Sequence, residues 1–476
     1  MLIEPVELVG VAELGAVHFI AIGGAGMSPI AAMYAELGVP VSGSDQADSA
    51  TLAGLAALGI RTYVGHDAAQ LGDAATVVVS SAIRPSNPEL VEARRRGLRI
   101  WHRSTALAAL MLGRTGVAVT GTHGKTTTSA MTAVLLTGAG ADPGYVVGSP
   151  LTDTGRAWHL GGGAAFVVEA DESDGSFRQY PAAIAVVTNV EADHLDNWGT
   201  PAAYADGFVD FATAPGVATV VISADDPGAV ALTPAIRRAG KHVVTVGESA
   251  GADVRLTAVE SAAGGSRAVL TADGDRGDLV LAVPGRYNLH NAAAAYAVGR
   301  ALGLPGGALR AAASGFSGTS RRFEPVAEVA GVRIFDDYAH HPTEVAATLT
   351  AARGMVGGGR LVACFQPHLF TRTRDFAGEF GRALALADEI VVLGIYPARE
   401  DPLPGVTGRL VADAAQALAT GHVHYVETLA EAAPALAAIV RPADLVVTLG
   451  AGDVTRAGPE LARLLRSREQ HRGDPA

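Results

Sequence analysis

Residues 117–131 read VAVTGTHGKTTTSAM, the clearest structural signal in the middle of the chain. Small and branched apolar residues run up to Thr120, where a turn rich in glycine and threonine begins. A buried strand that ends in such a turn and opens a helix is typical of phosphate-binding loops, because backbone N–H groups converge there on phosphate oxygens. The sequence therefore predicts a nucleotide site formed by Gly121, Thr122, Gly124, Lys125, Thr126 and Thr127.

The lysine of this loop is unusual for the chain. Of the 36 basic residues only Lys125 and Lys241 are lysines, and all the others are arginines. A compact ammonium group suits a phosphate cradle better than a guanidinium fork. We therefore expect Lys125 to contact the β- and γ-phosphates and Thr126 to offer its hydroxyl to Mg²⁺, rather than a plain glycine turn with a surface lysine.

Composition narrows the class of protein. The chain has 476 residues, of which 49% are hydrophobic and 18% are charged, as in ordinary globular domains. A net charge of −12 argues against a nucleic-acid surface, and the single cysteine, Cys364, excludes an internal disulfide. No signal peptide and no long apolar run stand out, so we expect a cytoplasmic protein that contacts neither nucleic acid nor a membrane.

Strand-like and helix-like patterns alternate along the whole chain, which predicts an α/β fold. They fall into three segments, residues 1–114, 115–321 and 322–476. Within the second segment, short runs with glycine turns around Val254–Val283 indicate a small antiparallel insert. The last residues, 466–476, are expected to form a frayed tail.

The first segment contains a second glycine turn. A strand at Val17–Ile22 leads into GGAGMS and a helix that reaches about Leu37. This arrangement is similar to a dinucleotide-binding turn, but Pro29 stands where the third glycine would be. An NAD-dependent oxidoreductase is therefore one alternative, and the diphosphate of another nucleotide is the preferred ligand.

Two strands of the second segment end in acidic clusters. Glu169 ends the run AFVVEA, and three more carboxylates follow within DESD. Like charges this close repel one another unless a cation neutralises them, and Mg²⁺ prefers carboxylate and phosphate oxygens. His194 follows the neighbouring run AIAVVTN, in the cluster DHLD, and is a second candidate ligand. A solvated acidic loop and a structural histidine are the alternatives.

The third segment adds DDYAHHP at 336–342 and FQPHLFTRTRD at 365–375. His368 and Arg372 are four residues apart and would share a helix face if this segment is helical. Together with Tyr338, they could hold the carboxylate of a small amino acid by bidentate contact. Helix capping or ion pairing between domains is the alternative.

These motifs, in this order, resemble the Mur ligase family, and in particular its alanine-adding branch. The matching stretches are AIGGAGMSPIA, TGTHGKTTT, EADESDGSF, TNVEADHLD, SGTSRRFE, DDYAHHPTE and FQPHLFTRTRDF, so the resemblance covers nearly the whole chain. It implies three domains: a Rossmann-like UDP-sugar domain at 1–114, a central P-loop ATPase domain with a mostly parallel sheet at 115–321, and a C-terminal Rossmann-like domain at 322–476.

The resemblance also implies residue roles. Lys125 would hold ATP, with Asn288, Asn291, Arg322 and Asp337 around the rest of the nucleotide. Thr126, Glu169 and His194 would bind Mg²⁺, as two ions for which Mn²⁺ can substitute. The UDP-sugar would contact Gly24, Ser44, Asp45, Ser81 and His123, and the amino acid would contact Tyr338, His340, His368 and Arg372.

The implied reaction is ATP-dependent ligation of L-alanine to the lactyl carboxylate of UDP-N-acetylmuramate through an acyl phosphate, by a monomer or homodimer. Two departures from the wider family stand out. No lysine lies between Lys125 and Lys241 to be carbamylated, and Tyr287 occupies a position often held by histidine. A murein tripeptide-recycling ligase remains an alternative within the family, and a nucleotide-binding switch remains one outside it.

Overall fold

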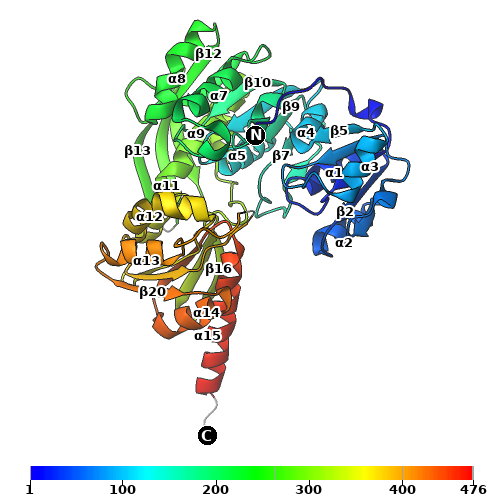
Figure 1. Cartoon of the computed structure of the whole chain (residues 1–476). Helices are drawn as coiled ribbons and strands as arrows, with labels where there is room; N and C mark the ends of the chain where they lie inside the picture. Colours follow the sequence, from blue (N-terminus) through cyan, green and yellow to red (C-terminus); the bar gives the residue numbers. More distant parts are fainter. Residues whose placement is uncertain (1, 263, 399, 474–476) are drawn as a thin grey trace. The chain divides into compact units, whose positions relative to one another are not determined.

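The computed structural model describes residues 2–262, 264–398 and 400–473 (Figure 1). The chain forms two compact units. The first comprises Met1–Ala258, Ala268–Leu279 and His290–Phe316, and the second comprises Val259–Arg267, Val280–Leu289 and Ser317–Ala476. Each unit has an α/β fold with mostly parallel sheets, which confirms the predicted fold class. Among the described residues, no helix is long and apolar enough to cross a membrane.

The amino-terminal sheet has five parallel strands in the order β3-β2-β1-β4-β5. Every residue of β1 is buried, as expected for a central parallel strand covered on both faces. The strands are β1 Val17–Ile20, β2 Val41–Asp45, β3 Arg61–Val64, β4 Thr76–Val79 and β5 Arg99–His102. Their helices are α1 Ser28–Glu36, α2 Ala50–Ala57, α3 Pro88–Arg95 and α4 Arg103–Leu110.

The next sheet has ten strands in the order β15-β14-β13-β12-β11-β10-β6-β9-β7-β8. Its central strands are parallel, and β7 and β8 pair antiparallel. The strands are β6 Thr115–Thr120, β7 Gly144–Val146, β8 Trp158–His159, β9 Ala165–Glu169, β10 Ala182–Val187, β11 Thr219–Ser223, β12 His242–Gly247, β13 Val254–Ala262, β14 Gly265–Ala272 and β15 Asp275–Leu281. The predicted insert at Val254–Val283 thus forms three strands at one end of this sheet rather than a separate sheet.

Two helices of this region, α7 (Pro201–Thr213) and α8 (Pro227–Arg238), begin where the sequence supplies a side-chain cap. Thr200 and Asp226 each accept a backbone N–H three residues on, and proline follows both. The helices are α5 Lys125–Gly138, α6 Leu195–Trp198, α7 Pro201–Thr213, α8 Pro227–Arg238, α9 Arg286–Ala301 and α10 Gly306–Ala313, with a 3-10 turn at Ser176–Gln179.

The carboxy-terminal sheet has six strands in the order β16-β17-β21-β18-β19-β20. Only the pair β16–β17 is antiparallel among those described. The strands are β16 Glu324–Val329, β17 Val332–Asp337, β18 Leu361–Phe365, β19 Glu389–Leu393, β20 His422–Val426 and β21 Leu445–Leu449. The helices are α11 Pro342–Arg353, α12 Phe370–Leu384, α13 Arg409–Gln416, α14 Leu429–Ile439 and α15 Ala457–Gly473.

Two local expectations were wrong. Helix α12 begins at Phe370, so His368 precedes the helix and does not share a helix face with Arg372. Leu369 between them has a backbone φ of +71°, which a helix interior does not allow. The predicted tail is helical up to Gly473, because α15 continues that far, while residues 474–476 lie outside the described range.

Candidate active site

The glycine-rich loop joins β6 to α5. Gly121 has a backbone φ of +135°, and a Cβ atom there would collide with Thr188 Oγ1. Gly124 has a φ of +81°, and a Cβ atom there would lie 3.0 Å from Asn291 Oδ1. Both positions therefore require glycine, and the turn they make leads the backbone into the first turn of α5, whose N–H groups have no helical acceptors. This is the backbone geometry of an anion site.

Lys125 turns its ammonium group back onto this loop. Its Nζ donates to the carbonyl oxygens of Gly121 at 2.7 Å and Thr122 at 3.1 Å. It also pairs with Glu172, at 3.1 Å from Oε1 and 2.9 Å from Oε2. Burial lowers the pKa of Lys125, but the nearby carboxylates outweigh burial and hold the pKa above its ordinary value. The lysine is therefore charged at neutral pH.

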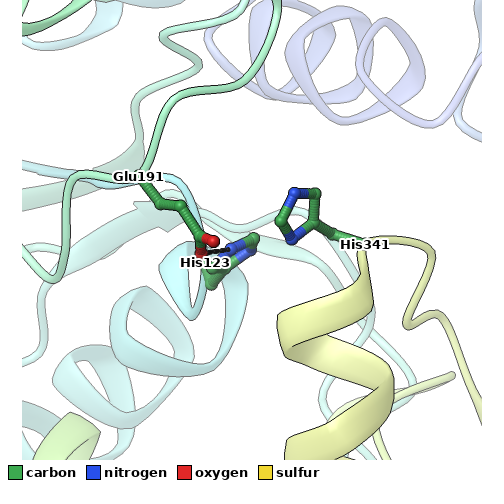
Figure 2. A group of neighbouring side chains, drawn as sticks. All are labelled: His123, Glu191 and His341. Atoms are coloured by element: carbon green, nitrogen blue, oxygen red, sulfur yellow. Dashed lines mark hydrogen bonds and ion pairs between the residues drawn. The ribbon is translucent and has the colours of Figure 1, made fainter. Parts of the chain in front are cut away.

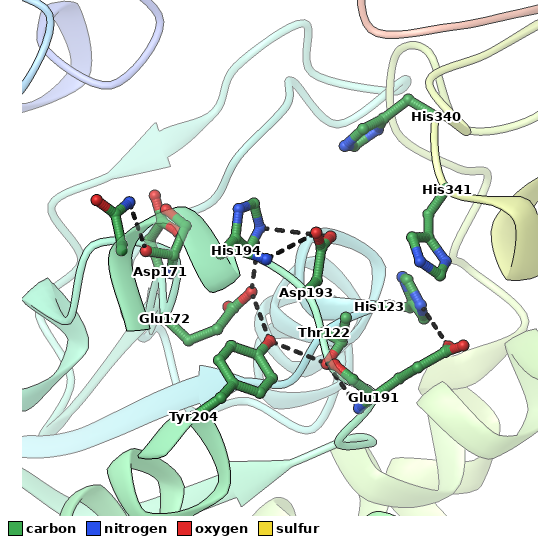
Figure 3. A network of polar contacts seen from close by, with 12 residues as sticks. Thr122, His123, Asp171, Glu172, Glu191, Asp193, His194, Tyr204, His340 and His341 are labelled. Atoms are coloured by element: carbon green, nitrogen blue, oxygen red, sulfur yellow. Dashed lines mark hydrogen bonds and ion pairs between the residues drawn. The ribbon is translucent and has the colours of Figure 1, made fainter. Parts of the chain in front are cut away.

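Glu172 lies at the centre of a buried polar network (Figure 3). Burial raises its pKa to about 7, although Lys125 acts in the opposite direction. The hydroxyl of Tyr204 donates to Glu172 Oε1 at 3.4 Å and lies 3.0 Å from Thr122 Oγ1. Trp198 Nε1 donates to the backbone carbonyl of Glu172 at 3.0 Å. The network thus connects the carboxylate cluster directly to the phosphate-type loop.

His194 also contacts Glu172 in this network (Figure 3). Its Nε2 is 3.9 Å from Glu172 Oε1 and 3.6 Å from Asp193 Oδ2. His194 has a backbone φ of +54°, a conformation that costs a non-glycine residue about 1–3 kcal/mol and is often found at functional sites. Glu169, at the end of β9, accepts the backbone N–H of Gly148 through Oε2 at 2.8 Å. The acidic run therefore meets His194 through Glu172, and the role of Glu169 as a ligand stays a prediction.

His123, within the loop, contacts Glu191, and their facing side chains are drawn in Figure 2. His123 Nε2 lies 3.0 Å from Glu191 Oε2, and the backbone N–H of His123 donates to Asn189 Oδ1 at 2.8 Å. Thr122 Oγ1 donates to the carbonyl oxygen of Glu191 at 2.9 Å. These contacts fix the loop against the segment that follows β10.

The first turn of α5 contacts α9 through Asn291. Thr128 Oγ1 donates to Asn291 Oδ1 at 3.1 Å, and Thr126 and Thr127 are both buried. The predicted adenine-side residue Asn291 therefore lies next to the phosphate-type loop. Asn288 lies one helical turn earlier, and its Nδ2 donates to the carbonyl oxygen of Pro284 at 2.6 Å.

Three of the predicted UDP-sugar residues lie at the carboxyl ends of β1 and β2. Gly24 donates its N–H to the carbonyl oxygen of Ala21 at 3.2 Å, in the turn after β1. Asp45 Oδ2 accepts the N–H of Gly23 at 2.9 Å. The hydroxyl of Ser44 is fully buried and donates to Glu89 at 2.7 Å. The Ser44 hydroxyl therefore points into the interior, toward Glu89.

Ser81 lies beside the carboxylate cluster. Its hydroxyl donates to Asp174 Oδ2 at 2.8 Å and lies 3.1 Å from His102 Nε2. Next to it, Arg103 donates to Asp171 Oδ2 at 3.0 Å. The first and second predicted segments therefore meet at the loop that carries Glu172.

In the second unit, Tyr338 contacts two arginines through its ring. The guanidinium carbons of Arg321 and Arg322 each lie 4.9 Å from the centroid of the Tyr338 ring, within cation–π range. The preceding residue, Asp337, is buried and accepts the backbone N–H of Ala339 at 2.7 Å. Burial raises the pKa of Asp337 to about 6, although Arg322 lowers it.

The predicted amino-acid residues of this unit form a row of rings. The ring centroids of Tyr338 and His340 are 5.1 Å apart, and those of His340 and His368 are 5.8 Å apart. His368 in turn stacks on Tyr396, with centroids 5.8 Å apart and ring planes within 12°. Burial lowers the pKa of His340 to about 3, and Arg372 and His368 act in the same direction. The four predicted residues are therefore neighbours.

Sequence reasoning missed three residues of these clusters. Glu172 is one of the four carboxylates of the acidic run, and its place in DESDGSF is the only sequence signal for its role. Tyr204 comes from α7, and nothing in its local sequence indicates a contact with Thr122. Tyr396 follows β19 in GIYPA, and only the fold brings it onto His368.

Comparisons with known proteins agree along the whole chain. The domain described as "Mur ligase family, catalytic domain" matches residues 16–115, "Mur ligase middle domain" matches 119–299, and "Mur ligase, glutamate ligase domain" matches 321–452. The UDP-N-acetylmuramate–L-alanine ligase of Cutibacterium acnes is 62% identical over 467 residues, covering 98% of this chain and 99% of that protein. The enzyme of the same name from Kineococcus radiotolerans is 56% identical over 464 residues, covering 96% and 98%.

Solved structures give the same result. The crystal structure of the UDP-N-acetylmuramate–alanine ligase from Thermotoga maritima matches with a TM-score of 0.78 and 29% identity, covering 96% of this chain and 99% of that one. A murein peptide ligase from Psychrobacter arcticus matches with a TM-score of 0.71 at 24% identity, covering 95% and 98%, and shows the shared fold. The glycine loop, the converging carboxylates and these full-length matches lead to one conclusion: the chain belongs to the Mur ligase family.

Proposed function

We propose that the protein joins L-alanine to the lactyl carboxylate of UDP-N-acetylmuramate, with conversion of ATP to ADP and phosphate, as a step in cytoplasmic peptidoglycan precursor synthesis. The observation that carries the proposal is the glycine loop with charged Lys125, in a chain 62% identical over nearly its full length to a relative of that name. The domain roles predicted for residues 1–114, 115–321 and 322–476 are part of the proposal.

The reaction needs ATP because a carboxylate has no adequate leaving group for attack by an amine. The lactyl carboxylate attacks the γ-phosphate, and ADP leaves. The neutral amine of alanine then attacks the carbonyl carbon of the acyl phosphate, the C–O bond to phosphate breaks, and the amine proton goes to solvent or a base. Both first-step reactants are anionic, so a positive charge held between them lowers the barrier. Lys125 supplies such a charge from a fixed position on the loop.

The residues fit a divalent ion in chemical type. Thr126 and Glu169 offer oxygen, the preferred donor for Mg²⁺, and His194 offers nitrogen, which Mn²⁺ accepts readily. When bound, such ions would neutralise phosphate charge and polarise the P–O bond. Of the three, His194 contacts the network around Glu172, which Tyr204 and Trp198 hold in place.

The remaining assignments follow the same proposal. The sugar nucleotide contacts the turn at Gly24 and Asp45. Ser44, Ser81 and His123 are the further residues assigned to it. Asn291 and Asn288 hold the adenine, Asp337 the ribose and Arg322 the phosphates. The row of Tyr338, His340 and His368, with Arg372, binds alanine, whose carboxylate suits a bidentate guanidinium.

The test is phosphate release from ATP with UDP-N-acetylmuramate and either L-alanine or the murein tripeptide, with the product identified by mass. Release driven by L-alanine, with the mass of UDP-N-acetylmuramoyl-alanine, supports the proposal. Release driven only by the tripeptide would keep the chemistry and replace synthesis with recycling. Release with neither amine would refute the assigned reaction.

A further inference from the structure

Every N–H donor of the Lys125 ammonium group already has an acceptor. It carries three N–H donors, and the structure gives it two loop carbonyls and the Glu172 carboxylate as acceptors. Nζ lies 2.9 and 3.1 Å from the two carboxylate oxygens, so the carboxylate faces the ammonium with both of them. For Lys125 to donate to phosphate oxygens, it must give up one of these acceptors.

Glu172 cannot easily move together with Lys125 when the lysine turns toward a phosphate. Glu172 is fully buried, its backbone carbonyl accepts from Trp198, and its side chain accepts from Tyr204. Its backbone carbonyl also accepts the N–H of Gly175 at 3.1 Å, within the loop that Arg103 holds through Asp171. Separating Lys125 from Glu172 would therefore remove the cation that faces a buried acidic group, which costs free energy.

We propose that Glu172 is a positioning residue that competes with nucleotide phosphates for Lys125, so that the protein binds ATP and ADP more weakly than the loop alone would allow. The inference rests on the proposed nucleotide site but not on the identity of the amine. A consequence concerns product release. After the reaction ADP dissociates more readily, because Glu172 pairs with Lys125 again.

If Glu172 stays paired with Lys125 when the nucleotide binds, the expected change in ADP affinity has the opposite sign. If Lys125 kept Glu172 while donating to phosphate, Glu172 would orient the ammonium and its removal would weaken nucleotide binding. Under competition, removal strengthens binding. The sign of the change in ADP affinity therefore separates competition from ordinary support of the loop.

The experiment is calorimetric titration of the full chain with Mg·ADP. For Glu172→Gln we expect an ADP dissociation constant at least about tenfold lower than that of the unchanged protein, which is about 1.4 kcal/mol. Asp171→Asn is the matched control, since it removes the same charge one residue away at a carboxylate that pairs with Arg103 instead. The ADP dissociation constant of Asp171→Asn should differ from that of the unchanged protein by less than about threefold. In a Lys125→Met background, Glu172→Gln should no longer tighten ADP binding.

An unchanged or higher dissociation constant for Glu172→Gln, at an unchanged thermal unfolding midpoint, overturns the inference. A second readout covers the case in which that variant does not fold. With only two lysines in the chain, ¹⁵Nζ-lysine labelling gives two signals, and Lys241, which donates to the carbonyls of Ala214 and Val217, is the internal reference. The Lys125 signal must shift on ADP saturation while that of Lys241 stays; an unmoved Lys125 signal also overturns the inference.

This inference and the proposed function can be refuted independently of each other. A protein that binds ADP as described but forms no UDP-muramoyl-alanine refutes the proposed reaction and leaves this inference standing. A protein that forms the product, but whose Glu172→Gln variant binds ADP no more tightly, refutes this inference alone.

Discussion

Replacing Gly121 with alanine should disable the glycine loop. The backbone φ of +135° at Gly121 is a conformation that alanine adopts only with strain of about 1–3 kcal/mol. The added Cβ would also meet Thr188 Oγ1 and lie 3.0 Å from the Thr188 backbone nitrogen. Thr188 therefore has to move, because the other atoms in contact belong to the backbone.

The displaced threonine has one hydroxyl proton, and the hydrogen bond that it makes would be lost or weakened. This hydroxyl lies 2.6 Å from the carbonyl oxygen of His123, the nearer acceptor, and 3.2 Å from that of Thr120. At about 0.5–1.5 kcal/mol for this bond, added to the strain, Gly121→Ala should reduce the free energy of unfolding by about 1.5–4.5 kcal/mol. Gly113 is the matched control, since it has a φ of +78° but no atom within 4 Å of the added Cβ, so only the strain should remain.

The assay is urea unfolding of both variants, followed by titration with Mg·ADP. We expect Gly113→Ala to lose about 1–3 kcal/mol and to bind ADP normally. Gly121→Ala should be less stable than this control and should bind ADP at least about tenfold more weakly, since the loop amides no longer converge. Equal stability of the two variants, together with normal ADP binding by Gly121→Ala, would refute the steric reasoning.

Three further predictions concern charge and metal. Lys125→Ala should lower product formation by about 10²-fold or more while the circular dichroism spectrum is unchanged, because a fixed positive charge at the phosphates is lost; near-normal turnover would contradict the assignment. Burial raises the pKa of Glu89, but the side chains of His18, Ser44 and His66 outweigh it and hold the pKa below its ordinary value of 4.5. The charged Glu89 therefore stabilises the fold above pH 4.5, and this stabilisation is lost as the pH falls through the lower folded pKa. Glu89→Gln should reduce the free energy of unfolding by about 3 kcal/mol at pH 7 and by progressively less in acid. Urea unfolding midpoints at several pH values measure this change. Removing divalent ions with a chelator should stop phosphate release, and Mn²⁺ should restore it, since His194 offers nitrogen; turnover that persists with the chelator would exclude the proposed ion sites.

The sequence was sufficient for the parts of the fold that local signals determine. The loop at Gly121–Lys125 was predictable because an apolar strand, two glycines and a helix start agree with one another. The contact between the acidic run and His194 was also predictable in part, since β9 and β10 run parallel on either side of β6, but the contact is made by Glu172 and not by Glu169.

Other features depend on tertiary packing. The contact of Tyr204 with Glu172 requires α7 to pack beside the acidic loop, and no local pattern encodes that distance. His368 was expected on a helix face, but Leu369 adopts a positive φ and α12 starts later, so His368 instead stacks on Tyr396. The domain limits and the residue roles stay predictions until ligands are tested.

The most direct test of the central claim follows an oxygen atom. UDP-N-acetylmuramate carrying ¹⁸O in its lactyl carboxylate is incubated with ATP, Mg²⁺ and L-alanine, and the released phosphate is analysed by mass. If the carboxylate attacks the γ-phosphate, one ¹⁸O leaves with each phosphate and the amide keeps the other. Phosphate free of ¹⁸O would contradict activation of the carboxylate by the nucleotide held at Lys125.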